Sequence, residues 1–111
     1  MTERIHTRCC IAGGGPAGSA DGTGSAASFN FPISVAVDSG GDVYVADNFN
    51  YTIRKITPDG VVTTLAGTPG MRGTANGTGS AARFTQLWSL VVDRSTANLY
   101  VADLYAIRPD A

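Results

Sequence analysis

The feature that most constrains this sequence is an internal repeat with an offset of about 55 residues. Residues 21–29 (DGTGSAASF) return as residues 76–84 (NGTGSAARF), and seven of these nine positions are identical. Further matches follow in the same order, with residues 33–38 resembling 88–93 and residues 43–47 resembling 99–103. Repeats of this length stack copies of one supersecondary unit on each other. The sequence therefore predicts two consecutive copies of a single small unit.

Each copy contains short runs of β-branched and aromatic residues that are separated by turn residues, and no run has a sustained helical period. Glycine and aspartate in residues 38–42 and in Pro58–Gly60 are typical of tight turns. The expected strands are residues 8–11, 33–37, 43–46, 51–56, 61–65, 88–92, 98–102 and 106–108. Four short strands in each unit are typical of a β-propeller blade. We expect an all-β fold made of two four-stranded antiparallel blades, which is an incomplete propeller.

The alternation of residue sizes along the strands predicts which side chains are buried. Ile33, Val35 and Val37 alternate with small residues, which predicts a strand that is buried among close neighbours. Trp88 occupies the position of Ile33 in the second copy, so we expect it to pack in the core. Trp88 and Phe84 are also the aromatic residues that could mark a ligand surface.

Residues 45–56 (VADNFNYTIRKI) resemble the signature of NHL repeats, in which an aspartate, an asparagine and a hydrophobic–basic pair recur. The resemblance assigns structural roles to Asp47, Asn50, Ile53 and Arg54, and to Asp103 and Arg108 in a second copy that is shorter and lacks the asparagine. It predicts residues 1–10 as a leader, 11–65 as the first repeat and 66–111 as a second, truncated repeat. It implies a module without enzymatic activity that binds a protein or another ligand.

A different motif lies at the N-terminus, where residues 8–18 resemble the opening of a flavin-dependent monooxygenase. Gly13, Gly15 and Gly18 would approach the pyrophosphate of FAD, which gives an oxidoreductase fragment as the alternative function. That role needs a helix directly after the glycines, and residues 19–24 contain two further glycines that disfavour one. The repeat also explains this string, because residues 65–70 occupy the same place in the second copy.

Composition bears on partners and chemistry. Eight basic residues are scattered and balanced by nine acidic residues, so an RNA-binding surface is not indicated. Most aspartates stand where a strand ends, which predicts roles in turns. His6, Glu3 and the adjacent Cys9 and Cys10 offer little for a metal or catalytic site. We therefore expect no catalytic residue, cofactor or metal.

The polar N-terminus and the absence of a long apolar run indicate neither a signal peptide nor a membrane span, which leaves the cytoplasm as the default compartment. Two blades would leave two apolar sheet faces uncovered. Two explanations remain open. The chain is a piece of a longer propeller, or copies of it close a ring, most simply a trimer with six blades in which the N-terminal strand completes the last blade.

Overall fold

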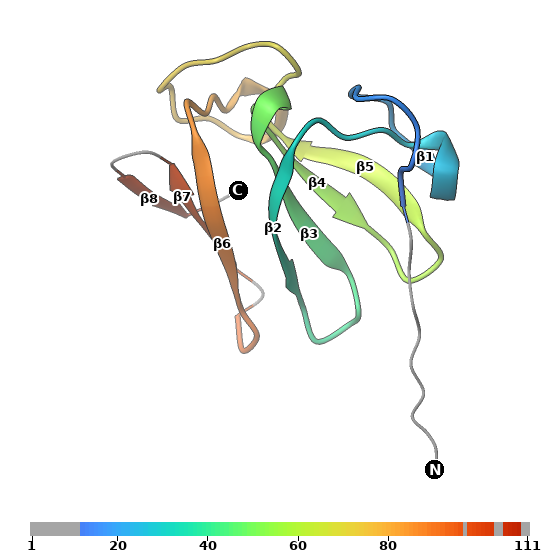
Figure 1. Cartoon of the computed structure of the whole chain (residues 1–111). Coiled ribbons are helices and arrows are strands. Elements are labelled where there is room, and N and C mark those ends of the chain that lie inside the picture. The colour runs from blue at the N-terminus through green and yellow to red at the C-terminus, as the bar shows by residue number, and fades with distance from the viewer. Residues whose placement is uncertain (1–11, 97, 104–105, 110–111) are drawn as a thin grey trace.

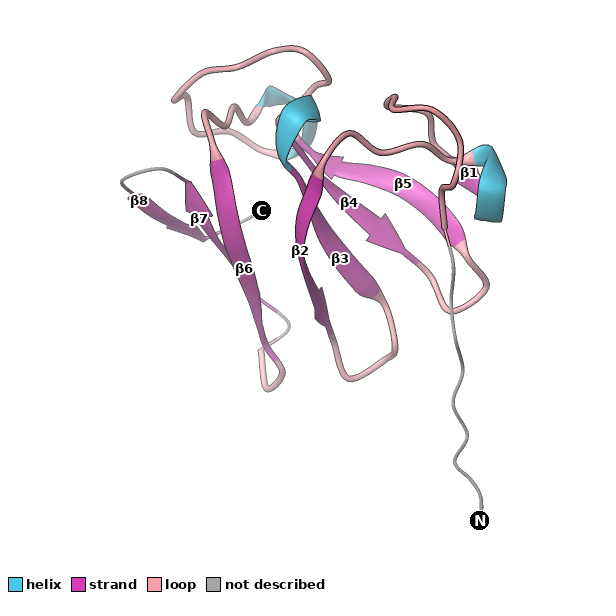
Figure 2. Ribbon diagram, viewed as in Figure 1, coloured by secondary structure: helices cyan, strands magenta, loops and turns pink. Residues whose placement is uncertain are grey.

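The computed structural model describes residues 12–96, 98–103 and 106–109, which form two antiparallel sheets that lie side by side (Figure 1). In chain order the elements are β1 (Gly22–Thr23), η1 (Gly24–Ala26), β2 (Pro32–Val37), β3 (Val43–Asp47), η2 (Asn48–Asn50), β4 (Thr52–Ile56), β5 (Val61–Ala66), η3 (Gly79–Ala81), β6 (Leu87–Asp93), β7 (Asn98–Asp103) and β8 (Ala106–Pro109). The three η elements are single 3-10 turns, so the described regular structure is almost entirely strand (Figure 2). The expected all-β fold is confirmed.

The first sheet has the strand order β1-β5-β4-β3-β2, and the second has the order β6-β7-β8. Strands β2 to β5 form the expected four-stranded unit, and the two-residue strand β1 from the entry loop extends its outer edge. The three strands of the second sheet correspond to β2, β3 and β4. The strand expected at residues 8–11 lies outside the described residues.

The two sheets are built in the same register, which shows that the sequence repeat is a structural repeat. Pro32 lies opposite Asp47 in the first sheet, and Leu87 lies opposite Asp103 in the second. An irregularity in the pairing follows each of these residues at the same place, between Pro32 and Ser34 and between Leu87 and Ser89.

A hydrophobic core lies between the two sheets. The buried residues Ala46 and Ile53 from the first sheet pack in one cluster with Leu90, Leu99 and Val101 from the second. Strands β2 and β6 lie next to each other at this interface (Figure 1). One face of each sheet is covered in this way. The opposite face of the first sheet is covered in part, where Ala27 of the entry loop packs with Val45, Ile56 and Val62 in a second buried cluster. The rest of that face and the opposite face of the second sheet are open.

Two burial predictions are wrong for the same reason. Val35 is 63% exposed and Val37 is also exposed, because their side of β2 is the open face of the first sheet. The small residues Ser34 and Ala36 face the second sheet instead. Trp88 is 53% exposed, although the equivalent Ile33 packs against the core. A blade face is buried only by the blade stacked on it, so residues of one repeat do not share one burial.

The glycine-rich loops of the two repeats share a hydrogen-bond pattern. The Gly67 backbone N–H donates to the Gly79 carbonyl at 3.1 Å, and the Gly73 N–H donates to the Phe84 carbonyl at 3.0 Å. In the first loop the equivalent bonds join Gly13 to Gly24 and Gly18 to Phe29, both at 3.1 Å. These loops therefore carry a defined backbone structure.

We predict that Gly67→Ala destabilises the fold far more than Gly70→Ala. Both glycines have positive φ angles, +85° and +79°, which strain any other residue. A Cβ at Gly67 would also overlap the Tyr51 carbonyl oxygen, whereas a Cβ at Gly70 would meet open space. Urea unfolding should place Gly67→Ala at least about 2 kcal/mol below Gly70→Ala in stability. Equal stabilities would contradict the close approach.

We also predict a pH-dependent contact at the turn between β2 and β3. Burial raises the pKa of Tyr44 to about 12, assisted by the 2.9 Å hydrogen bond that its hydroxyl donates to the Asp38 carboxylate. Because the folded-state pKa lies above the ordinary 10.0, this stabilisation is complete below pH 10.0 and is lost as the pH rises through about 12. Ultraviolet titration of tyrosinate should show a late-titrating component that disappears in Tyr44→Phe. A titration left unchanged by Tyr44→Phe would contradict the assignment.

Candidate functional site

The motif residues of the first repeat form one buried hydrogen-bond network at the end of β3. The Asp47 Oδ2 accepts bonds from the Asn50 Nδ2 at 2.7 Å and from the Arg54 Nη1 at 3.1 Å. The Asp47 Oδ1 accepts a bond from the Asn30 backbone N–H at 2.8 Å, which fixes the chain just before β2. Ile53, the other motif residue, is fully buried in the core between the sheets. The NHL-like residues of this repeat are therefore brought together.

Arg54 joins this network to the entry loop. Its guanidinium donates to the Ser28 and Ala20 carbonyl oxygens, both at 2.8 Å, and to the Asp21 carboxylate at 3.0 Å. It also lies over the Phe29 ring, 4.8 Å from the ring centroid. The arginine side chain is almost completely buried. Its planar fork of donors suits several fixed acceptors at once, so it fastens the loop to the sheet.

The electrostatics of Asp47 reflect its burial. Burial raises the pKa of its carboxyl, and the hydrogen bonds from Asn30, Asn50 and Arg54 oppose that rise. Without the guanidinium, the charged carboxylate would lose its counter-charge in a site that excludes water. The two side chains therefore depend on each other.

In the second repeat the aspartate is also buried, and like Asp47 it accepts a bond from the backbone just before the first strand of its sheet. The Asp103 Oδ1 accepts bonds from the backbone N–H groups of Thr85 and Gln86, both at 2.9 Å, and from the Thr85 hydroxyl at 3.1 Å. Arg108 lies opposite Val101 in β8, as Arg54 lies opposite Val45 in β4. The side chain of Arg108 lies outside the described part of the structure.

A polar hollow of about 240 Å³ lies at this end of the sheets, between the two repeats. One wall comes from the turn after β3 and the other from the loop before β6. The lining residues are Asn48, Phe49, Tyr51, Arg72, Thr85 and Gln86. Asp103 fixes the Thr85–Gln86 wall, and the Leu87 N–H donates to the Asn48 Oδ1 at 2.9 Å, which joins the two walls.

Exposed aromatic residues stand beside this hollow. The rings of Phe31 and Phe49 stack with centroids 4.8 Å apart and an angle of 18° between their planes, although both side chains are exposed. Phe31 and Tyr51 both have a φ of +58°, in the left-handed region that non-glycine residues seldom adopt. Backbone strain of this kind concentrates at binding sites, where the surrounding structure holds it in place.

The glycines of the alternative flavin motif have another role in the structure. The N–H groups of Gly13 and Gly18 donate to carbonyl groups of their own loop, and Gly15 lies exposed between them. Residues 19–21 have no regular structure, and the two-residue β1 and the 3-10 turn η1 follow. The strand–turn–helix geometry that holds a pyrophosphate is therefore not formed by the described residues.

Sequence reasoning missed the hollow and placed the possible ligand surface at Phe84 and Trp88. Phe84 is buried in the core, and Trp88 lies on the open face of the second sheet. The hollow combines residues from both copies, so neither copy alone predicts it. The only available signal was Phe49, an aromatic residue in the short segment between two predicted strands.

Comparison with known protein families identifies the unit. The NHL repeat family matches residues 29–56, which run from Phe29 through Asp47, Asn50 and Arg54 to the end of β4. These residues are an NHL repeat. The resemblance seen in the sequence is thereby confirmed, and the residues of the buried network belong to the matched segment. No curated protein matches the chain.

Solved structures resemble the chain over most of its length. A protein of unknown function from Bacteroides thetaiotaomicron aligns over 92% of this chain with 27% identity and a TM-score of 0.81. A protein described as "Putative phosphatase" from the same organism aligns over 90% with 28% identity and a TM-score of 0.76. An auxiliary nutrient binding protein from Bacteroides ovatus aligns over 86% with 26% identity and a TM-score of 0.69.

This chain covers 26%, 25% and 27% of those three chains, so it spans about a quarter of their length. The NHL repeat and its structural counterpart thus form two neighbouring sheets of the β-propeller type. The helices in the described part of the chain are three-residue turns, and none of them could cross a membrane.

We predict that Arg54→Met in the NHL repeat destabilises the fold by about 3 to 5 kcal/mol, because it removes the cation of a buried ion pair together with all of the guanidinium hydrogen bonds. The neighbouring Lys55→Ala is the control. Lys55 forms a partly exposed pair with Asp42 at 3.5 Å, which contributes about 0 to 1 kcal/mol. Urea unfolding followed by circular dichroism gives both values, and similar losses in the two variants would show that Arg54 does not hold the loop.

Proposed function

We propose that this chain is a non-enzymatic binding module whose ligand site is the polar hollow between the two repeats. The observation that carries the proposal is the pair of stacked, exposed rings of Phe31 and Phe49 beside a hollow that buried aspartates hold in shape. Exposed aromatic rings on a rigid frame provide apolar contact area at a low entropic cost. The polar lining adds directional hydrogen bonds.

The lining residues favour a small polar ligand that carries hydrogen-bond acceptors and an apolar face. Arg72 can bind a carboxylate or another acceptor through its guanidinium, and Asn48 and Gln86 offer amide groups. Phe49 and Tyr51 supply the apolar side of the hollow. The partner class expected from the sequence, a protein or another ligand, is narrowed here to a small molecule.

The absence of catalytic groups from this lining supports binding without catalysis. None of the six lining side chains is a carboxylate, a histidine or a cysteine, the groups that most often act as acid, base or nucleophile. In the described residues, no group of three or more His, Cys, Asp or Glu side chains could hold a metal ion. Two auxiliary nutrient binding proteins among the similar structures are consistent with a binding role.

We expect ligand-observed NMR to detect saturation transfer from the purified chain to at least one compound in mixtures of sugars, sugar acids and amino acids. Arg72→Gln should weaken that binding about tenfold or more, because a charged hydrogen bond contributes about 1.5 to 3 kcal/mol. Phe49→Ala should weaken it by removing the ring that contacts the apolar face of the ligand.

Lys55→Ala, on the β4 strand and outside the hollow, is the control and should bind as the wild type does. The proposal would be wrong if no compound bound, or if Arg72→Gln and Phe49→Ala bound as tightly as Lys55→Ala. Conversion of a bound compound into product during the measurement would overturn the non-enzymatic assignment alone.

A further inference from the structure

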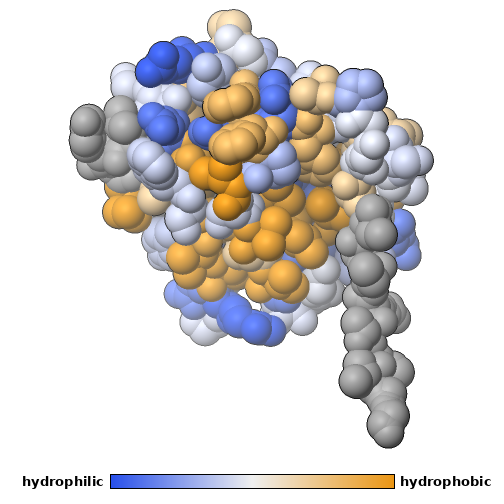
Figure 3. Space-filling view, viewed as in Figure 1, coloured by the Kyte–Doolittle hydropathy of each residue, from blue (hydrophilic) through white to orange (hydrophobic). Residues whose placement is uncertain are grey.

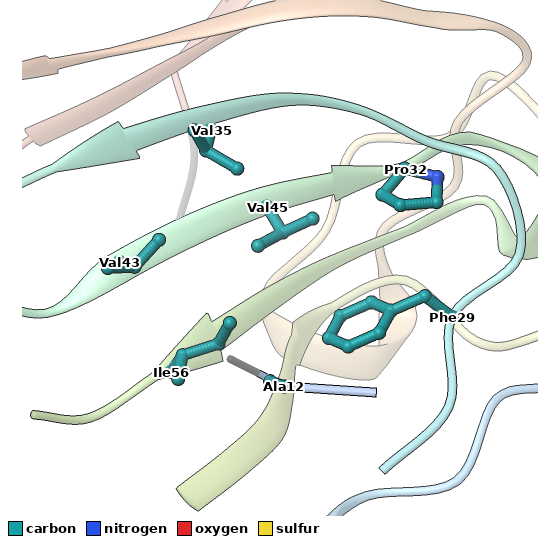
Figure 4. A pocket seen from close by; sticks show the side chains of 7 residues that line it. All are labelled: Ala12, Phe29, Pro32, Val35, Val43, Val45 and Ile56. Atoms are coloured by element: carbon teal, nitrogen blue, oxygen red, sulfur yellow. The ribbon is translucent and has the colours of Figure 1, made fainter. Parts of the chain in front are cut away.

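Both sheets present an open apolar face. On the first sheet we call it the valine face, formed by the exposed Pro32, Val35 and Val37, the half-buried Val43 and, beneath them, the buried Val45 and Ile56. On the second sheet we call it the tyrosine face, formed by Ser89, Val91, Tyr100, Ala102 and Ile107. Apolar side chains gather over β2 and β3 in the space-filling view (Figure 3). The valine face also contains a hollow of about 310 Å³, into which Val35, Val43 and Val45 point (Figure 4).

The covered interface between the sheets shows what each open face is built to contact. By register, the valine face is equivalent to the face of the second sheet that is buried, and the tyrosine face is equivalent to the buried face of the first. Leu90 on the covered face is 5% exposed, whereas the equivalent Val35 on the valine face is 63% exposed. Ile53 on the covered face is 0% exposed, whereas the equivalent Ile107 on the tyrosine face is 71% exposed. A valine face therefore fits against a tyrosine face.

The residues that differ between the covered and open faces change size in opposite directions. Leu90 and Leu99 are replaced on the valine face by Val35 and Val43, a loss of one methylene group at each position. On the tyrosine face Val91 replaces Ala36, which adds two methylene groups. Core packing tolerates such changes when the total volume is kept.

The same compensation holds at the end of the sheets. Trp88 stands where the smaller Ile33 packs, and Pro32 stands where the larger Leu87 packs. The side chains of the valine face are therefore smaller than their covered equivalents, and those of the tyrosine face are larger. Most of the other positions are identical, with Ser89, Tyr100 and Ala102 matching Ser34, Tyr44 and Ala46.

One hydrogen bond of the covered interface has neither its donor nor its acceptor on the two open faces. The Leu87 N–H donates to the Asn48 Oδ1 in the covered interface. On the valine face the donor position is Pro32, which has no N–H. Leu104, which stands at the position of Asn48 in the second copy of the sequence, has no side-chain acceptor. Contact between the two open faces would therefore leave neither a donor nor an acceptor unpaired at this place.

We propose that the valine face of one copy of this chain packs on the tyrosine face of a second copy. The contact joins different surfaces, so successive copies are added head to tail until they close a ring. Propellers typically close with about four to eight blades, so two blades per chain correspond to a ring of about two to four copies. This assembly is separate from ligand binding in the polar hollow.

The oligomeric state and the fluorescence of Trp88 test the proposal. Trp88 is the only tryptophan, and the contact would cover it. Light scattering on the purified chain should give a mass about two to four times that of one chain, without growth as concentration rises. Val35→Glu and Val91→Glu should each reduce the mass severalfold, to that of one chain, and Val35→Glu should shift Trp88 emission to the red. Ser39→Glu, in an exposed turn outside both faces, should keep the wild-type mass.

Mixing the two variants distinguishes this contact from any other. Val35→Glu keeps an intact tyrosine face and Val91→Glu keeps an intact valine face, so an equimolar mixture should form a dimer and recover blue-shifted emission. Circular dichroism shows whether each variant is folded, and Val37→Glu with Ile107→Glu is a second pair. A monomeric wild-type chain would overturn the proposal. So would continued growth in size, wild-type assembly of either variant alone, or a mixture that stays monomeric.

Discussion

Arg54 extends from β4 to the carbonyl groups of Ser28 and Ala20, so one buried guanidinium fastens the first sheet to the loop that enters it. A buried charge is costly unless it is paired and hydrogen-bonded. Both terminal nitrogens of Arg54 have acceptors, and Asp47 and Asp21 supply the opposite charges; the Nε alone has no partner among the described residues. Asp47 in turn holds the chain at Asn30, which determines where β2 begins. The entry loop, the edge strand and the turn after β3 therefore depend on Arg54 and its two carboxylate partners, Asp47 and Asp21.

This dependence explains which parts of the fold the sequence predicts. The predicted strands agree with β2 to β8 to within one or two residues, because β-branched runs and turn residues act locally. The spacing of Asp47, Asn50 and Arg54 is also local, so the motif is visible in the sequence. Burial is different, because it depends on a neighbouring sheet. The alternation of Ile33, Val35 and Val37 predicts one buried face. The irregularity at the start of β2 instead places Ile33 against the core, and Val35 and Val37 lie on the open face.

The sequence did not predict the polar hollow, because its lining residues come from two repeats. Asn48 and Phe49 follow β3 of the first repeat, whereas Arg72 and Gln86 precede β6 of the second. Only the packing of one sheet on the next brings these segments together, and the bond from Leu87 to Asn48 fixes their spacing. The sequence of one repeat contains only part of the lining of the hollow. The proposed binding site therefore lies between the units, while the recognisable motif lies within one.

The two repeats keep the same buried aspartate, whereas the loop residues beside the hollow differ between them. Asp47 and Asp103 occupy the same buried position, and the asparagine that binds Asp47 has no equivalent in the sequence of the second repeat. Both aspartates nevertheless fix the residues just before the first strand of their own sheet. The backbone N–H groups donate these hydrogen bonds whatever side chain the residue carries. The side chains at the hollow can therefore change while these bonds are kept. The same frame therefore presents Phe31 in one repeat and Gln86 in the next. In the proposed site, these loop residues rather than the NHL motif would select the ligand.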